Sequence, residues 1–102
     1  MTKPNAKRSP KWPALRRRHL KAHPSCKACG CAVKGELEAH HVKPFHLFPR
    51  SELRAENLVT LCERKGSSGC HMRLGHLGNW KKWNPLVRSQ ANKARAKLRK
   101  SQ

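Results

Sequence analysis

The fold is decided by residues 26–31, which read Cys-Lys-Ala-Cys-Gly-Cys. Two cysteines with two residues between them, next to a glycine that can turn the chain sharply, are typical of one half of a tetrahedral zinc site. Cys62 and Cys70 can complete a set of four thiolates with Cys26 and Cys29. Seven residues separate Cys62 from Cys70, whereas a gap of two residues is more typical of a pair of zinc ligands. Cys31 therefore remains an alternative to one of them.

A chain this small and polar needs such a cross-link. It has 102 residues, of which 36% are hydrophobic, and its mean hydropathy is −0.88. Buried apolar area in so short a chain hardly offsets the conformational entropy lost on folding. The five cysteines are an odd number and no secretory segment follows Met1, which favours metal over a disulfide framework. We expect one domain, located in the cytoplasm.

The charge of the chain is strongly positive. It carries 24 Lys and Arg against 5 Glu and no Asp, which gives a formal net charge of +19. Such a surface favours a phosphate backbone as partner, because each neutralised phosphate releases counterions. No apolar run approaches the length that spans a membrane. We therefore expect DNA as the partner and predict backbone contacts from Arg16, Arg17, Arg18, Lys43, Arg95 and Lys97.

Composition divides the chain into a flexible basic arm (residues 1–11), a compact domain (12–87) and a basic C-terminal helix or tail (88–102). The domain should open with a short helix that begins at Pro13 and ends before Pro24.

Two strands, at 37–42 and 58–61, should follow, joined by a loop that is long for a hairpin. Residues 62–69 predict a turn, and a helix should begin near Cys70. Trp80 and Trp83 are three residues apart and predict one apolar face of a further short helix, packed into the core.

Two adjacent histidines, His40 and His41, lie on the first expected strand. Neighbouring side chains on a strand point to opposite faces, so these two imidazoles can do different work. One can bind a divalent cation that neutralises charge on a phosphate, while the other takes a proton from water on the far side. Asn57 is available to position this pair.

His40-His41, Asn57 and Cys70-His71, interleaved with the other cysteines over residues 26–76, resemble the HNH endonuclease family. The resemblance implies an α+β fold, a small zinc-stapled ββα-metal core with flanking N- and C-terminal helices. It also implies a structural zinc ion and a catalytic Mg²⁺ or Mn²⁺, with Ni²⁺ or Zn²⁺ as alternatives.

The resemblance also implies site roles. His40 and His71 would hold the catalytic ion, His41 would be the general base, Asn57 would brace the loop and orient His41, and Glu38 would be a carboxylate supporting the metal site. The candidate for a third ligand is His76. His76 lies five residues after His71, about 140° round an ideal α-helix, and so faces away unless Gly75 breaks the helix.

These observations predict a metal-dependent DNA endonuclease that nicks double-stranded DNA with low sequence specificity. Nicking is expected because one active site per monomer cuts one strand at a time, and we expect a monomer or weak dimer. Small freestanding members of the family resemble phage and prophage proteins encoded beside packaging proteins. The alternative is a non-catalytic zinc-stabilised module that binds nucleic acid, in which His41 would have no role.

Overall fold

A computed structural model describes residues 8–63 and 69–100 of the chain. Helix α1 spans Trp12–Ala22 and is followed by strand β1 (Leu37–His41), strand β2 (Leu58–Cys62), the short helical turn η4 (His71–Gly75) and helix α2 (Val87–Lys100). The expected α+β fold is confirmed, and both strands, α1 and α2 lie within a residue or two of their predicted bounds.

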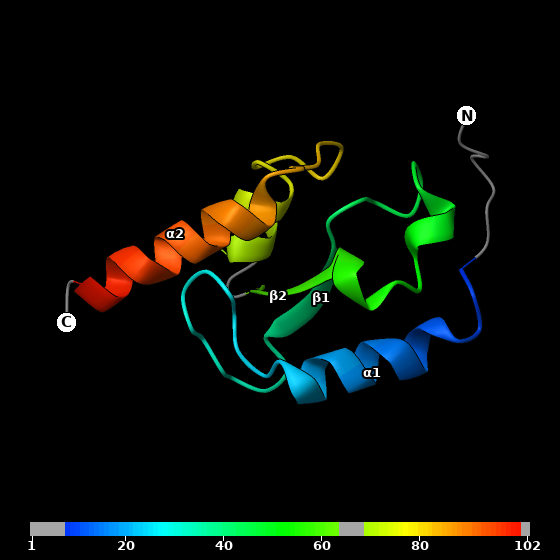
Figure 1. Cartoon of the computed structure of the whole chain (residues 1–102), viewed down its shortest axis with the longest axis horizontal. Coiled ribbons are helices and arrows are strands. Elements are labelled where there is room, and N and C mark those ends of the chain that lie inside the picture. Colours follow the sequence, from blue (N-terminus) through cyan, green and yellow to red (C-terminus); the bar gives the residue numbers. More distant parts are fainter. Residues whose placement is uncertain (1–7, 64–68, 101–102) are drawn as a thin grey trace.

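The strands form a two-stranded antiparallel sheet in which His40 is opposite Val59 and His41 is opposite Leu58. Helix α1 covers one face of this sheet, whereas η4 and α2 lie on the other (Figure 1). Because side chains alternate along β1, His41 faces α1 while His40 faces η4. The adjacent histidines therefore lie in two different environments.

The hydrophobic core is small and is centred on β2 and α2. Leu61 and Val87 are fully buried, and the other buried residues around them are mostly small: Cys26, Ala28, Val59, Cys62 and Ala91. Two of these seven core residues are cysteines of the predicted zinc site. The core thus depends on the geometry of the cysteines as well as on apolar packing.

Two predictions after β2 need correction. The helix expected near Cys70 is a single π-helical turn that ends at Gly75, and the predicted short helix with Trp80 and Trp83 is absent from the described structure. Residues 76–86 instead form turns, and Leu77 (φ 53°) and Gly78 (φ 83°) have left-handed backbone angles that a helix cannot include. Trp80 is 54% exposed rather than part of the core.

The basic arm was predicted to be flexible over residues 1–11. Residues 1–7 lie outside the described residues, but the backbone N–H of Ser9 donates to the Glu52 carboxylate at 3.0 Å, so the end of the arm is fixed to the domain. Of the turn predicted at 62–69, residues 64–68 also lie outside the described part. No helix in the described residues is long and apolar enough to cross a membrane.

Candidate active site and metal centres

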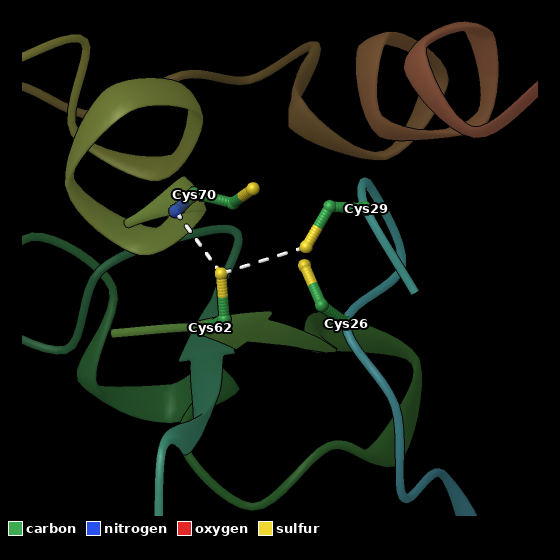
Figure 2. Close-up of side chains that lie close together, drawn as sticks. All are labelled: Cys26, Cys29, Cys62 and Cys70. Carbon is green, nitrogen blue, oxygen red and sulfur yellow. Dashed lines mark hydrogen bonds between the residues drawn. The ribbon is translucent and has the colours of Figure 1, made fainter. Parts of the chain in front are cut away.

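Four cysteine sulfurs form a compact cluster. The Sγ atoms of Cys26, Cys29, Cys62 and Cys70 all lie within 4.8 Å of one another, and those of Cys29 and Cys62 are 3.7 Å apart (Figure 2). Zinc–sulfur bonds of about 2.3 Å in a tetrahedron place the sulfurs roughly 3.8 Å apart. The cluster is therefore consistent with a structural zinc site, and the cluster contains Cys62 and Cys70 but not Cys31.

Local backbone structure brings these cysteines together. Gly30 has φ 81° and donates its N–H to the carbonyl of Cys26 at 2.8 Å, which closes the knuckle. The N–H of Lys27 donates to the carbonyl of Thr60 at 2.9 Å and fixes the knuckle to β2. Cys62 ends β2 and Cys70 immediately precedes η4, so a metal here would join three segments.

The thiol pKa values favour a cation in this cluster. A hydrogen bond from Cys70 lowers the pKa of Cys26 to about 4, whereas burial raises the pKa of Cys29 to about 11. The pKa of Cys70 is also raised, first by its hydrogen bond to Cys26 and then by burial. Among Cys26, Cys29 and Cys70, these shifts favour one thiolate, and a bound cation would stabilise more.

Three histidines form a second cluster on the η4 side of the sheet. One ring nitrogen from each of His40, His71 and His76 lies within 4.8 Å of the others. The Nε2 atom of His40 is buried and has no hydrogen-bond partner among the described residues, which points to a ligand there. Burial, followed by the charges of His71 and His76, lowers the pKa of His40 to about 3, so its nitrogen is available to a metal near pH 7.

His76 joins this cluster because η4 is a π-helical turn. The N–H of His76 donates to the carbonyl of His71 at 3.2 Å, an i to i+5 bond that places the fifth residue over the first. In the α-helix that we predicted, the same residue would face away from the cluster. Gly75 permits this arrangement, because a Cβ there would lie 2.9 Å from Cε1 of His40.

Hydrogen bonds fix the orientation of two of these rings. Nδ1 of His76 donates to the carbonyl of Lys82 at 2.9 Å, and Nδ1 of His71 lies 3.3 Å from the Glu63 carboxylate. Each ring is therefore left with Nε2 for a metal, the usual pattern in which a carboxylate or carbonyl supports a ligand histidine. Sequence reasoning missed Glu63, although its place directly after Cys62 was an available signal.

Glu38 was predicted to support the metal site, but its carboxylate is bound elsewhere. It accepts from Nε of Arg16 at 2.7 Å and from the N–H of Ala39 at 3.1 Å. This hydrogen bond with Glu38 raises the pKa of Arg16. The pair joins α1 to β1, so Arg16 has an internal partner and is not a free phosphate contact.

His41 is buried on the opposite face of β1. Its Nε2 lies 2.9 Å from the carbonyl oxygen of Glu52, which can only accept, so Nε2 carries the proton and Nδ1 keeps the lone pair. The ring of Trp12 packs against the imidazole with centroids 4.4 Å apart. Burial, partly opposed by the hydrogen bond to Glu52, lowers the pKa of His41, so the ring is neutral at pH 7.

Asn57 braces the loop between the strands. Its Oδ1 accepts from the N–H of Lys43 at 2.8 Å, and its Nδ2 donates to the carbonyls of Lys43 and Ser51 at 3.1 and 3.2 Å. The direct partner of His41 is Glu52 rather than Asn57. Asn57 thus binds the carbonyl of Ser51, the residue directly before the Glu52 that binds His41.

The side chain of Glu52 connects this loop to the N-terminal segment. The carboxylate is 5% exposed and accepts two contacts from the N–H of Ser9, at 3.0 and 3.3 Å, while Arg8 lies 3.6 Å away. The same residue thus holds the imidazole of His41 through its carbonyl and the end of the arm through its carboxylate.

The other predicted DNA contacts lie in different places on the surface. Arg17 and Arg18 are exposed on α1, and Lys43 lies over the ring of Phe48 with Nζ 5.7 Å from its centroid. On α2, Lys97 is exposed, whereas Arg95 is half-buried and packs over Gly30. Their contacts with DNA remain predictions.

Comparison with known families identifies the class of the protein. The model of the HNH endonuclease family matches residues 26–76, the segment that contains both metal clusters, β1 and β2. Comparisons with curated proteins and with solved structures found no match. The chain belongs to the HNH endonuclease family, which implies a nuclease-type enzyme with a nucleic acid as its substrate.

Replacing Glu63 by glutamine should weaken metal binding at the histidine cluster about 10- to 100-fold, because the carboxylate that supports His71 is lost. We would measure Mn²⁺ affinity by calorimetry, with Glu36→Gln as the matched control for loss of one negative charge. Equal affinities for the two variants would show that Glu63 does not support a ligand.

Proposed function

We propose that this protein is a metal-dependent endonuclease that nicks double-stranded DNA with low sequence specificity. The observation that carries the proposal is the division between His40 and His41 across β1. His40 belongs to a three-histidine cluster and has a buried nitrogen without a partner among the described residues, whereas the carbonyl of Glu52 binds Nε2 of His41 and leaves Nδ1 as its acceptor nitrogen.

His41 has the properties of a general base. Its Nδ1 would take a proton from water as the water oxygen forms a bond to phosphorus, and the bond from phosphorus to one ester oxygen breaks. The carbonyl of Glu52 fixes the tautomer and would stabilise the imidazolium that results. Neutral His41 at pH 7 matches this role.

His40, His71 and His76 fit a divalent cation, and we propose Mg²⁺ or Mn²⁺, with Ni²⁺ or Zn²⁺ as alternatives. A cation bound there would neutralise charge on the scissile phosphate and on the leaving oxygen. Water and phosphate oxygens would complete the ligand set that the three rings provide.

Supercoiled plasmid tests this proposal. The purified protein, with its zinc content measured, is incubated with plasmid in low EDTA and, separately, with Mg²⁺, Mn²⁺, Ni²⁺ or Zn²⁺. We expect open circles only with an added divalent ion, with linear DNA appearing later through independent second nicks. Nicks spread over many positions on a denaturing gel would agree with low specificity. Intact plasmid under every metal condition would refute the nuclease and leave a zinc-stabilised binding module.

A further inference from the structure

A groove with a volume of about 770 Å³ runs along the outer edge of β2, between the end of α1 and helix α2. Its walls come from α1, from the knuckle at Ser25–Lys27, from Leu58–Thr60 of β2 and from α2. The four histidines of the candidate active site do not line it, and it shares only Cys26 with the cysteine cluster. The groove is therefore distinct from the candidate active site.

The wall supplied by α2 is a polar, mainly cationic stripe. Arg88, Asn92, Arg95 and Arg99 are three or four residues apart, so they share one face of the helix, and all of them line the groove. Lys27 adds a fourth cation from the opposite wall. One carboxylate, that of Glu56, also lies at the groove, 72% exposed and 4.0 Å from Arg54.

Two of the arginines are held in place by the fold. Nη2 of Arg88 donates to the carbonyls of Glu56 and Leu58 at 2.7 and 3.0 Å, and the guanidinium of Arg95 lies against Gly30 so closely that a Cβ there would be 2.8 Å from its Cζ. Guanidinium groups that are already positioned lose less conformational entropy when they bind an anion.

The backbone edge of β2 is largely engaged, which bears on the kind of partner. Arg88 occupies the carbonyl of Leu58, and the N–H of Lys27 occupies that of Thr60. A peptide strand that added to this edge would need those carbonyls. The charged side chains left to meet a ligand are mainly the cations of the α2 stripe and Lys27, which fit a chain of phosphates.

We propose that this groove binds the sugar-phosphate backbone of DNA outside the candidate active site, since none of the four active-site histidines lines it. The identification of the ligand as DNA rests on the proposed function, but binding can be measured without cleavage. The groove would lengthen the contact with the duplex through charge, without reading bases.

The test compares two double variants that remove the same charge. Lys27→Gln with Arg99→Gln changes exposed cations of the groove, whereas Lys93→Gln with Lys100→Gln changes exposed cations on other faces of α2. Affinity for a 30-base-pair duplex is measured by fluorescence anisotropy from 50 to 200 mM salt, with zinc-loaded protein and no added divalent ion.

We expect the groove variant to bind about tenfold more weakly at 100 mM salt and to lose about 1.8 from the slope of log K against log salt, since each phosphate contact contributes about 0.9. The control variant should lose less than threefold. Equal losses in the two variants would overturn the proposal and indicate diffuse attraction by net charge.

A second pair of variants tests the groove without removing any of its cations. Asn92→Glu places a carboxylate within the stripe, whereas Ser89→Glu places one outside it on the same helix. Weaker binding by Asn92→Glu alone supports the groove, and equal binding by both contradicts it. Because neither comparison depends on nicking, tight and groove-dependent binding by an inactive protein would refute the nuclease and leave the groove standing.

Discussion

Replacing His41 by alanine should lower the rate of plasmid nicking by about 100- to 10,000-fold, the range that a general base contributes. The imidazole is the group whose free nitrogen is set by the carbonyl of Glu52, and alanine leaves no proton acceptor at that position. The substitution also removes a buried ring from beside Trp12, so zinc content and duplex binding must be measured to show that the variant is folded.

The matched control is His46→Ala, which removes an exposed imidazole from the loop between the strands. We expect its nicking rate to stay within about threefold of wild type. A folded His41→Ala protein that nicks at the rate of the control would show that His41 is not the base. If neither the wild type nor the His46→Ala control nicks plasmid, the binding module is favoured, and in that module His41 has no chemical role.

Features set by local chemistry could be predicted from the sequence. The CxxC spacing with Gly30 indicated the knuckle, and proline at the start of α1 indicated where that helix begins. The placement of His40 and His41 on opposite faces follows from the alternation of side chains along any strand. The same alternation is what led us to propose different roles for the two histidines, one binding a metal and the other accepting a proton.

Features set by tertiary packing could not be predicted in this way. The period of an α-helix predicted that His76 faces away from the cluster. In the structure, Gly75 packs closely against His40, and the wider π-helical turn brings His76 to the cluster. The family resemblance singled out Glu38 and not Glu63, but Arg16 on α1 binds the carboxylate of Glu38, while the carboxylate of Glu63 lies 3.3 Å from Nδ1 of His71.

The positions of Trp80 and Trp83 are also set by tertiary packing and could not be predicted from their spacing. Their spacing suggested a buried helical face, yet the segment forms turns, and Trp80 lies against the rings of His71 and His76 with centroids 5.3 and 4.7 Å away. Trp83 packs instead against the ring of Phe48, with centroids 5.4 Å apart, so neither ring belongs to the core of alanine, valine, leucine and cysteine.

Replacing Cys62 by serine should abolish zinc binding and the cooperative unfolding of the domain. Cys62 ends β2, its sulfur lies 3.7 Å from that of Cys29, and it accepts the N–H of Cys70 at 3.4 Å, so it connects all three segments of the cluster. Structural zinc contributes about 10–16 kcal/mol of binding free energy in small domains. The core here is too small to replace that contribution.

The chain contains its own control, because Cys31→Ser makes the same change of sulfur to oxygen at a cysteine outside the cluster. Zinc content by mass spectrometry and thermal unfolding by circular dichroism should show one zinc per chain and a nearly unchanged transition for Cys31→Ser, with neither for Cys62→Ser. A Cys62→Ser protein that retains both would refute the structural zinc site. Nicking should disappear with the zinc even in excess Mg²⁺, because Cys70 holds the start of the turn that carries His71 and His76.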